Sequence, residues 1–204
     1  MRLYWGKMSP FARKVTLTAH ETGLFDQIAL EPVTVSMSLA NPEVQEANPL
    51  SKIPTLLLDD GSALYDSRTI CEYLAAIGSP GTLFPDGPER WDSLRRQSLG
   101  DGAMDALLLW RQERLKPVER QTPEWLDTFS AKLSSTLAHL DDEAARMASL
   151  PFDIGHISIA CALTYLDVRF EDIDWRSDAP RLADWHAEFE RRPSAVATHP
   201  FNLP

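Results

Sequence analysis

Residues 48–70 read NPLSKIPTLLLDDGSALYDSRTI, and this stretch decides the fold. Two short apolar runs, 55–58 and 62–65, are separated by the sequence DDG at 59–61. An Asp-Gly pair between two strand-like runs is a strong signal for a tight hairpin turn. The two runs are therefore predicted to be neighbouring antiparallel strands.

The first 78 residues alternate strand-like and helix-like patterns around this hairpin. In chain order we predict a strand at 2–5, a helix at 10–22, a strand at 28–35, at most a short helix within 38–48, the hairpin, and a helix at 67–77. Because the hairpin follows crossover connections, the four-stranded sheet is predicted to be mixed. Thioredoxin-like folds have this order of elements.

The rest of the chain carries helical patterns only. Three prolines and two glycines fall within residues 79–88, a composition typical of a linker. Beyond it we predict helices at 89–114, 123–147, 158–170 and 181–191, and a loosely ordered tail at 198–204. The expected organisation is a thioredoxin-like α/β domain at 1–78, a linker at 79–87, and an all-α helical-bundle domain at 88–204.

The composition excludes several classes of function. Among 204 residues, 30 are acidic and 20 are basic, and the resulting net charge of −10 repels nucleic acid and anionic membrane surfaces. No signal peptide and no membrane-spanning segment is evident, so a cytoplasmic protein is expected. Cys71 and Cys161 have no CxxC spacing and the five histidines have no ligand spacing, which argues against a disulfide scaffold or a metal site.

The first motif that could carry chemistry is SPFARKV at residues 9–15, between a strand and a helix. Ser9 followed by Pro10 is a well-formed helix start, and Ser9 serves there as an N-cap. Alternatively, the Ser9 hydroxyl donates a hydrogen bond to an anion at the positive end of the helix. Spacing alone leaves both interpretations open.

The second motif is the turn around Pro54, which interrupts a strand-like sequence just before its apolar part. Pro54 can simply begin a strand in the trans form. The alternative is a cis Ile53–Pro54 bond that turns the Ile53 backbone outward, where its N–H and C=O can pair with a peptide ligand.

The third motif is LYDSRTI at residues 64–70, where Asp66 and Ser67 lie between a strand and a helix. One interpretation is again a helix cap. The other is a site for a zwitterion, in which Asp66 attracts an ammonium group while Ser67 and the helix N-terminus receive a carboxylate.

Together the three motifs resemble the glutathione S-transferase superfamily, in which an SPF helix start, a KIP turn and a DS helix start recur in this order and spacing. The resemblance covers essentially the whole chain and is closest to bacterial members with serine at the first helix start. It implies that Ser9 is the catalytic group on the glutathione sulfur. It also implies that the glutathione-binding residues are Ser9, Phe11, Lys52, Ile53, Pro54, Asp66 and Ser67.

The resemblance further implies a pocket for a second, electrophilic substrate, bordered by the first helix of the helical domain. Its candidate residues are Met8, Phe11, Met104, Asp105, Leu108 and Trp110, although core packing also explains the apolar ones. A homodimer is implied as well, in which Asp101 or Asp105 could reach glutathione across the interface. The expected partners are thus glutathione, a small electrophile and a second copy of the chain.

The sequence departs from the family at Gly155–Cys161. Ser158 stands where a helix N-cap is expected, but Cys161 replaces the aspartate that would complete a capping box, so half of that box is expected to be missing.

The implied function is a glutathione transferase active in detoxification, with glutathione as co-substrate and no metal. Two alternatives remain. The chain could be a non-catalytic module that binds glutathione, apolar ligands or another protein. A glutathione-dependent thiol reductase would instead need a nucleophilic cysteine at the first helix start, where this chain has Ser9.

Overall fold

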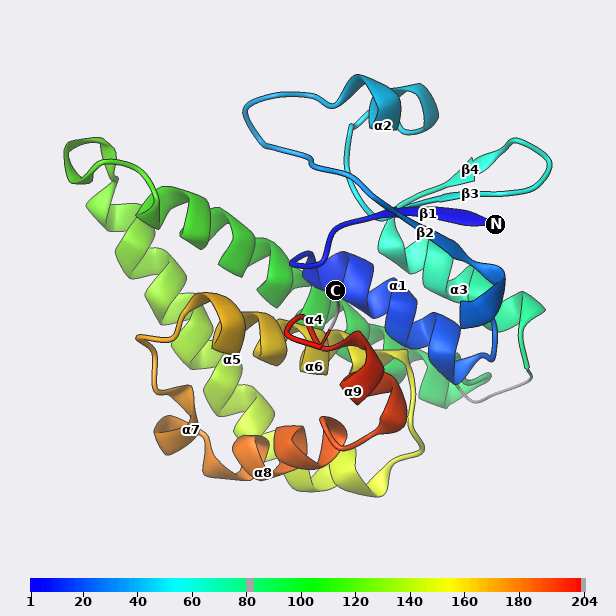
Figure 1. Cartoon of the computed structure of the whole chain (residues 1–204). Coiled ribbons are helices and arrows are strands. Elements are labelled where there is room, and N and C mark those ends of the chain that lie inside the picture. The colour runs from blue at the N-terminus through cyan, green and yellow to red at the C-terminus, as the bar shows by residue number, and fades with distance from the viewer. Residues whose placement is uncertain (80–82, 203–204) are drawn as a thin grey trace. The chain divides into compact units, whose positions relative to one another are not determined.

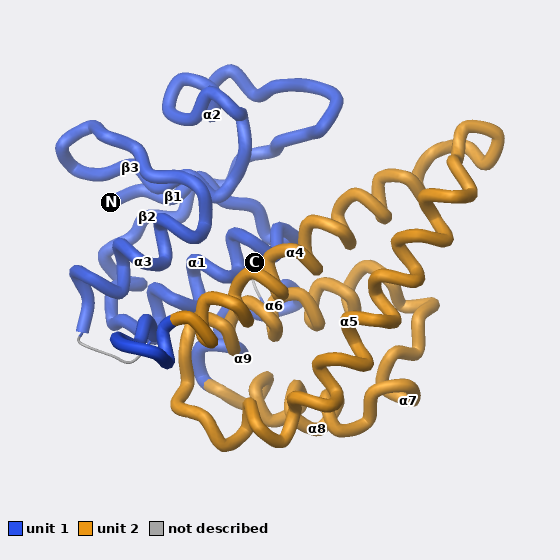
Figure 2. Tube along the Cα trace, turned by 180° about the vertical axis from the view of Figure 1, so that it is seen from behind, with its two compact units in different colours: residues 1–90, 193–204 blue, residues 91–192 orange. Residues whose placement is uncertain are grey.

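The computed structural model describes residues 1–79 and 83–202, which form two compact units (Figure 1, Figure 2). Unit 1 comprises residues 1–90 and 193–204, and unit 2 comprises residues 91–192. The expected domains, 1–78 and 88–204, differ from these units chiefly in the C-terminal segment, which groups with unit 1. Within the expected linker, residues 80–82 lie outside the described part of the chain.

A mixed sheet forms the centre of unit 1. Its strands are β1 (Arg2–Trp5), β2 (Ala29–Pro32), β3 (Thr55–Leu57) and β4 (Ala63–Leu64), in the spatial order β2-β1-β3-β4. β1 is parallel to β2 and antiparallel to β3, and β3 is antiparallel to β4. The predicted mixed four-stranded sheet and its hairpin are confirmed. β2 is shorter than predicted and ends at Pro32, which pairs with Trp5, the last residue of its neighbour β1.

Helices cover both sides of this sheet. α1 (Pro10–Glu21) and α3 (Ser67–Ile77) lie on one face, and the short α2 (Pro42–Ala47) lies on the other side (Figure 1). A 3-10 turn, η1 (Phe25–Gln27), connects α1 to β2. The core between sheet and helices consists of apolar side chains that are fully buried, among them Leu3, Val15, Leu56, Ile70 and Leu74.

A further short helix, α9 (Pro193–Thr198), packs on α1 within unit 1. The Ser194 hydroxyl hydrogen-bonds the Glu21 carboxylate, and the Arg13 guanidinium donates to the Ala195 carbonyl at 3.3 Å. The sequence did not predict α9, because six residues are too few to display a helical period.

The described residues of unit 2 form helices and their connecting loops, without a strand. Its elements are α4 (Pro88–Arg114, which begins in unit 1), η2 (Val118–Arg120), α5 (Pro123–Ser149), α6 (Ile154–Arg169), α7 (Trp175–Asp178) and α8 (Pro180–Phe189). The predicted all-α character is confirmed, although α7 was not predicted. As expected, α6 is enclosed: every residue from Ile154 to Leu166 is buried.

The start of α6 corrects one prediction. The helix begins at Ile154, and its N-cap is Asp153 rather than Ser158, which is fully buried inside the helix. A complete capping box is present: the Asp153 carboxylate accepts from the His156 N–H at 3.2 Å, and the His156 ring faces the Asp153 N–H at 3.2 Å. The prediction that half of the capping box is missing was therefore wrong. Asp caps a helix as well as Ser does, and a histidine takes the reciprocal role here.

Both cysteines are buried, as expected for small hydrophobic side chains. Across residues 1–79 and 83–202, no helix combines the length and the apolar character that crossing a membrane requires.

Candidate functional site

The three motifs meet at one edge of the sheet in unit 1. β1 ends beside the start of β3, because Tyr4 pairs with Thr55. β4 also ends there, because Leu64 pairs with Leu56. The turn before α1, the turn before β3 and the turn before α3 therefore share this edge, which we call the motif edge. The N-termini of α1 and α3 both lie at it, and each supplies unpaired N–H groups and a partial positive charge.

Ser9 is half-buried at the end of the turn that follows β1. Its N–H donates to the Gly6 carbonyl at 2.9 Å, and its Oγ accepts from the Ala12 N–H at 3.2 Å. Ser9 is thus the N-cap of α1, with Pro10 in the first helical position. A serine hydroxyl can donate one hydrogen bond while it accepts others. Its proton has no acceptor among the described residues, so capping and donation to a ligand are compatible.

The turn before β3 contains a cis Ile53–Pro54 peptide bond, as the ligand-binding interpretation requires. Ile53 is half-buried and Pro54 is buried. Gly6 lies against this turn, since a Cβ added at Gly6 would come within 2.9 Å of the Ile53 side chain. The turn that carries Ser9 and the turn that carries Ile53 are therefore in contact.

Asn48 holds the turn before β3 in place. Its side chain is 1% exposed and donates to the Lys52 carbonyl at 3.1 Å and to Thr55 Oγ1 at 3.0 Å. Its own Oδ1 accepts from the Leu50 N–H at 3.1 Å. Asn48, the first residue of the stretch 48–70, had no predicted role. Asn is frequent in such turns because its amide imitates a backbone group.

Asp66 and Ser67 start α3 at the same edge. Asp66 is the N-cap, and its Oδ1 accepts from the Arg68 N–H at 2.9 Å. The Asp66 carboxylate is exposed and has no cationic partner among the described residues. Ser67 is only 2% exposed, yet its hydroxyl makes no hydrogen bond within the described part of the chain. The Tyr65–Asp66 bond is also cis.

The remaining candidates in unit 1 lie around these turns. Met8 and Phe11 flank Ser9 and Pro10 and are half-buried, whereas Lys52 is exposed next to Ile53. The structure thus brings the predicted glutathione-binding residues of all three motifs to the motif edge. It offers hydroxyl donors, backbone groups and one carboxylate, which together suit a ligand that carries both anionic groups and an ammonium group.

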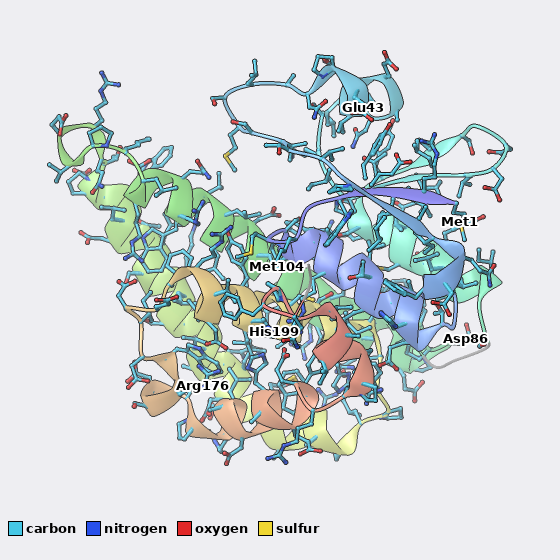
Figure 3. The ribbon with its side chains drawn as sticks, in the orientation of Figure 1. Met1, Glu43, Asp86, Met104, Arg176 and His199 are labelled. Atoms are coloured by element: carbon cyan, nitrogen blue, oxygen red, sulfur yellow. The ribbon has the colours of Figure 1, made fainter. Side chains whose placement is uncertain are left out.

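The candidates on α4 are described within unit 2 alone. Met104, labelled in Figure 3, is fully buried, and Asp105 is exposed. Trp110 is 7% exposed and packs in the core of unit 2, with its ring 5.2 Å from that of Phe170. Leu108 is partly buried against the same core. Asp101 is fully buried.

Within residues 1–79 and 83–202, no group of three or more His, Cys, Asp or Glu side chains could hold a metal ion.

Family models match both parts of the chain. The glutathione S-transferase N-terminal domain matches residues 8–77, and the glutathione S-transferase C-terminal domain matches residues 123–188. The first match spans all three motifs.

Similar proteins cover nearly the whole chain. A glutathione transferase family member from Pseudomonas fluorescens Pf-5, solved with bound glutathione, is 44% identical over 98% of each chain, with a TM-score of 0.93. A structure from the same organism with bound S-(propanoic acid)-glutathione is 43% identical over 98% of this chain and 99% of that one, with a TM-score of 0.89. The uncharacterized GST-like protein YibF of Escherichia coli K12 is 29% identical over 98% of both sequences.

Proposed function

Because the chain belongs to the glutathione S-transferase family, we propose that it binds glutathione at the motif edge and transfers it to a small, largely apolar electrophile. One observation carries this proposal: Ser9 caps α1 through its oxygen and keeps its hydroxyl proton for a ligand. The bound glutathione and the bound glutathione conjugate in the similar structures from Pseudomonas fluorescens Pf-5 support it.

Each part of the motif edge has a role in this proposal. Ser9 donates its proton to the glutathione sulfur, and the Ile53 backbone pairs with the cysteinyl unit. Asp66 attracts the ammonium group of the γ-glutamyl end, while Ser67 and the N-terminus of α3 receive its carboxylate. Lys52 attracts the glycyl carboxylate, and Phe11 borders the sulfur.

The second substrate belongs beside that sulfur. We propose as its candidate contacts Met8 and Phe11 in unit 1 and, separately in unit 2, Met104, Asp105, Leu108 and Trp110 on α4. Asp105 is exposed and Leu108 is partly buried, so these two side chains can contact a substrate directly. Met104 and Trp110 are buried and act chiefly by packing against their neighbours.

Glutathione supplies a thiolate, which is a far better nucleophile than the thiol. A new carbon–sulfur bond forms with the electrophile, the leaving group departs with its electron pair, and the thiol proton is released to solvent. A free thiol has a pKa near 8.5, and each unit of depression requires about 1.4 kcal/mol of preferential stabilisation of the anion. One hydrogen bond to a charged acceptor contributes roughly 1.5 to 3 kcal/mol, so the Ser9 hydroxyl supplies about one to two units.

Turnover by the Ser9→Ala variant tests this role. The expected result is a loss of kcat of about 10- to 100-fold with an activated aryl chloride, with glutathione affinity nearly unchanged, since only the anion is stabilised by the hydroxyl. The matched control is Ser62→Ala, which removes the hydroxyl of an exposed serine in the β3–β4 hairpin. Equal turnover by Ser9→Ala and the wild type would remove Ser9 from the mechanism, and binding without any turnover would favour a non-catalytic module.

The finer assignments rest on the family resemblance. We infer a cytoplasmic homodimer with a role in detoxification, in which Asp101 or Asp105 could approach glutathione bound to the partner. Sedimentation equilibrium checks the oligomeric state directly, and a monomer at micromolar concentration would contradict this assignment.

A further inference from the structure

A pocket of about 520 Å³ lies between the C-terminal ends of α4 and α6, entirely within unit 2. The residues that line it are Arg111, Arg114, Leu115, Val168, Arg169, Phe170, Glu171 and Asp172. Three arginines in one pocket are notable because acidic residues outnumber basic ones by 30 to 20 in the whole chain.

One of these arginines is fully engaged within the protein. Arg114 bonds the Asp172 carboxylate at 2.6 Å, and its guanidinium lies over the rings of Trp110 and Phe170, at 5.6 and 5.1 Å from their centroids. Arg114 and Asp172 therefore neutralise each other. Glu171 is exposed and forms no ion pair with a described residue.

The other two arginines lack such a partner. Neither Arg111 nor Arg169 forms an ion pair with any carboxylate of the described residues. The Nε–H of Arg169 is buried and has no hydrogen-bond partner in the described part of the chain. A buried donor without an acceptor costs free energy that a ligand can recover.

The two charges also act on each other. Burial, and then the positive charge of Arg111, lower the pKa of Arg169, whereas the Tyr165 phenol opposes this shift. Tyr165 lies one turn before Arg169 on α6, and burial raises the pKa of its phenol. An anion placed between the two guanidinium groups would relieve their repulsion and accept from the unpaired Nε–H.

We propose that Arg111 and Arg169, supported by Tyr165, form an anion subsite that binds a carboxylate of the second substrate. This inference rests on the proposed function, because Arg111 lies one turn beyond Leu108 on the part of α4 that we assign to the second-substrate pocket. The substrate class is then an electrophile that carries a carboxylate, such as an unsaturated or halogenated acid, rather than a wholly apolar one.

Two glutathione conjugates of equal length test the subsite, S-(2-carboxyethyl)glutathione and S-propylglutathione, which differ only in a terminal carboxylate. Isothermal titration calorimetry on the full chain should show that the carboxylate conjugate binds about tenfold more tightly, equivalent to about 1.4 kcal/mol. The Arg111→Gln/Arg169→Gln double variant should bind both conjugates equally. Arg120→Gln, which removes an exposed positive charge elsewhere in unit 2, should keep the preference.

Three results would overturn the proposal. The first is equal binding of the two conjugates by the wild type, and the second is a preference that survives in the double variant. The third is a loss of affinity for glutathione itself in the double variant that is as large as its loss of affinity for the carboxylate conjugate. The last result would mean that the subsite holds a carboxylate of glutathione and not one of the electrophile.

A second measurement separates this inference from the proposed function. Propionate alone should shift the Arg169 Nε–H resonance in the ¹H–¹⁵N spectrum of the full chain, and Arg169→Gln identifies that resonance. If neither conjugate binds but propionate produces the shift, the proposed function fails and the anion subsite stands. If propionate produces no shift, the subsite is refuted whether or not glutathione binds.

Discussion

Ser9 shows how one side chain can meet two demands at once. In the sequence, a helix cap and a hydrogen-bond donor to an anion are competing interpretations of the same hydroxyl. In the structure the cap uses only an oxygen lone pair, which receives the Ala12 N–H. The proton remains available, and the serine stays half-buried at a helix N-terminus, where an anion is favoured.

We expect Asn48 to contribute both to the stability of the fold and to the affinity for glutathione. Asn48→Ala removes the donors to the Lys52 carbonyl and Thr55 Oγ1, which then keep only the hydrogen bond between them, and it removes the acceptor of the Leu50 N–H. The free energy of unfolding should fall by about 1 to 3 kcal/mol, as measured by urea denaturation. The Kd of glutathione should rise severalfold, because the turn that carries Ile53 loses its support.

Asn41→Ala is the control for this prediction. It removes the N-cap of α2, also in unit 1, and should cost about 1 kcal/mol of stability without changing glutathione affinity. An Asn48→Ala protein that is destabilised but binds glutathione as tightly as the wild type would refute the positioning role.

For individual residues, the sequence predicted which side chains lie at the motif edge, because each candidate adjoins a strand end or a helix start. It could not predict the role of Asn48, whose partners are set by the backbone path of the turn. Nor could it identify the pair Arg111 and Arg169, which are 58 positions apart and meet only because α4 and α6 end side by side.

At the scale of elements, α4 and α6 approach closely through a glycine. A Cβ added at Gly100 would lie 2.5 Å from the Ser158 carbonyl carbon and 2.6 Å from the Ile159 nitrogen, both backbone atoms that cannot rotate away. Gly100→Ala should therefore destabilise the protein by about 1 to 3 kcal/mol or more, measured by thermal or urea denaturation.

Gly102 on the same helix provides the matched comparison. A Cβ there meets nothing within 4 Å, so Gly102→Ala should stabilise the protein by about 0.5 to 1 kcal/mol through helix propensity. Similar effects of the two substitutions would contradict the close packing of α4 on α6.

The start of α6 is held by a buried ion pair as well as by its cap. The Asp153 carboxylate accepts from the Arg96 guanidinium at 2.6 Å, and His156 Nδ1 lies 2.7 Å from its Oδ1. Asp153→Ala should lower the unfolding free energy by about 3 to 5 kcal/mol, because the buried Arg96 guanidinium loses a carboxylate that neutralises its charge. Asp153→Asn keeps an acceptor for the cap and should cost less.

The same carboxylate makes stability depend on pH. Burial favours the protonated form of Asp153, but His156 and Arg96 outweigh burial and lower its pKa. A depressed pKa in the folded state gives stability that is complete above the unfolded value of about 3.9 and is lost as pH falls through the folded value. The difference in unfolding free energy between the wild type and Asp153→Asn should thus be constant above pH 5 and shrink below pH 4. A constant difference down to pH 3 would contradict this account.

Element boundaries show where sequence patterns lose their information. The long helices α4 and α5 and the β3–β4 hairpin were predicted closely, because their periods and turn residues are strong. The start of α6 was misplaced by four residues, because its apolar residues continue all round the helix and give no face that marks an end. The short helices α7 and α9 were missed for lack of length.

At the scale of the whole molecule, the chain separates its tasks between two units. The motif edge belongs entirely to unit 1, and the anion subsite belongs entirely to unit 2. Sequence patterns predicted the α/β and all-α parts, yet they could not assign the last residues to unit 1, because that grouping depends on the contact of α9 with α1.

The central claim is that the motif edge binds glutathione as a thiolate through Ser9. The most direct test is a pH titration of the thiolate absorbance of glutathione bound to the wild-type protein and to Ser9→Ala. We predict a bound-state pKa well below the free value of about 8.5, and a rise of about one to two units in the variant. A bound thiol whose pKa is unshifted in the wild type, or equally depressed in both proteins, would contradict the account.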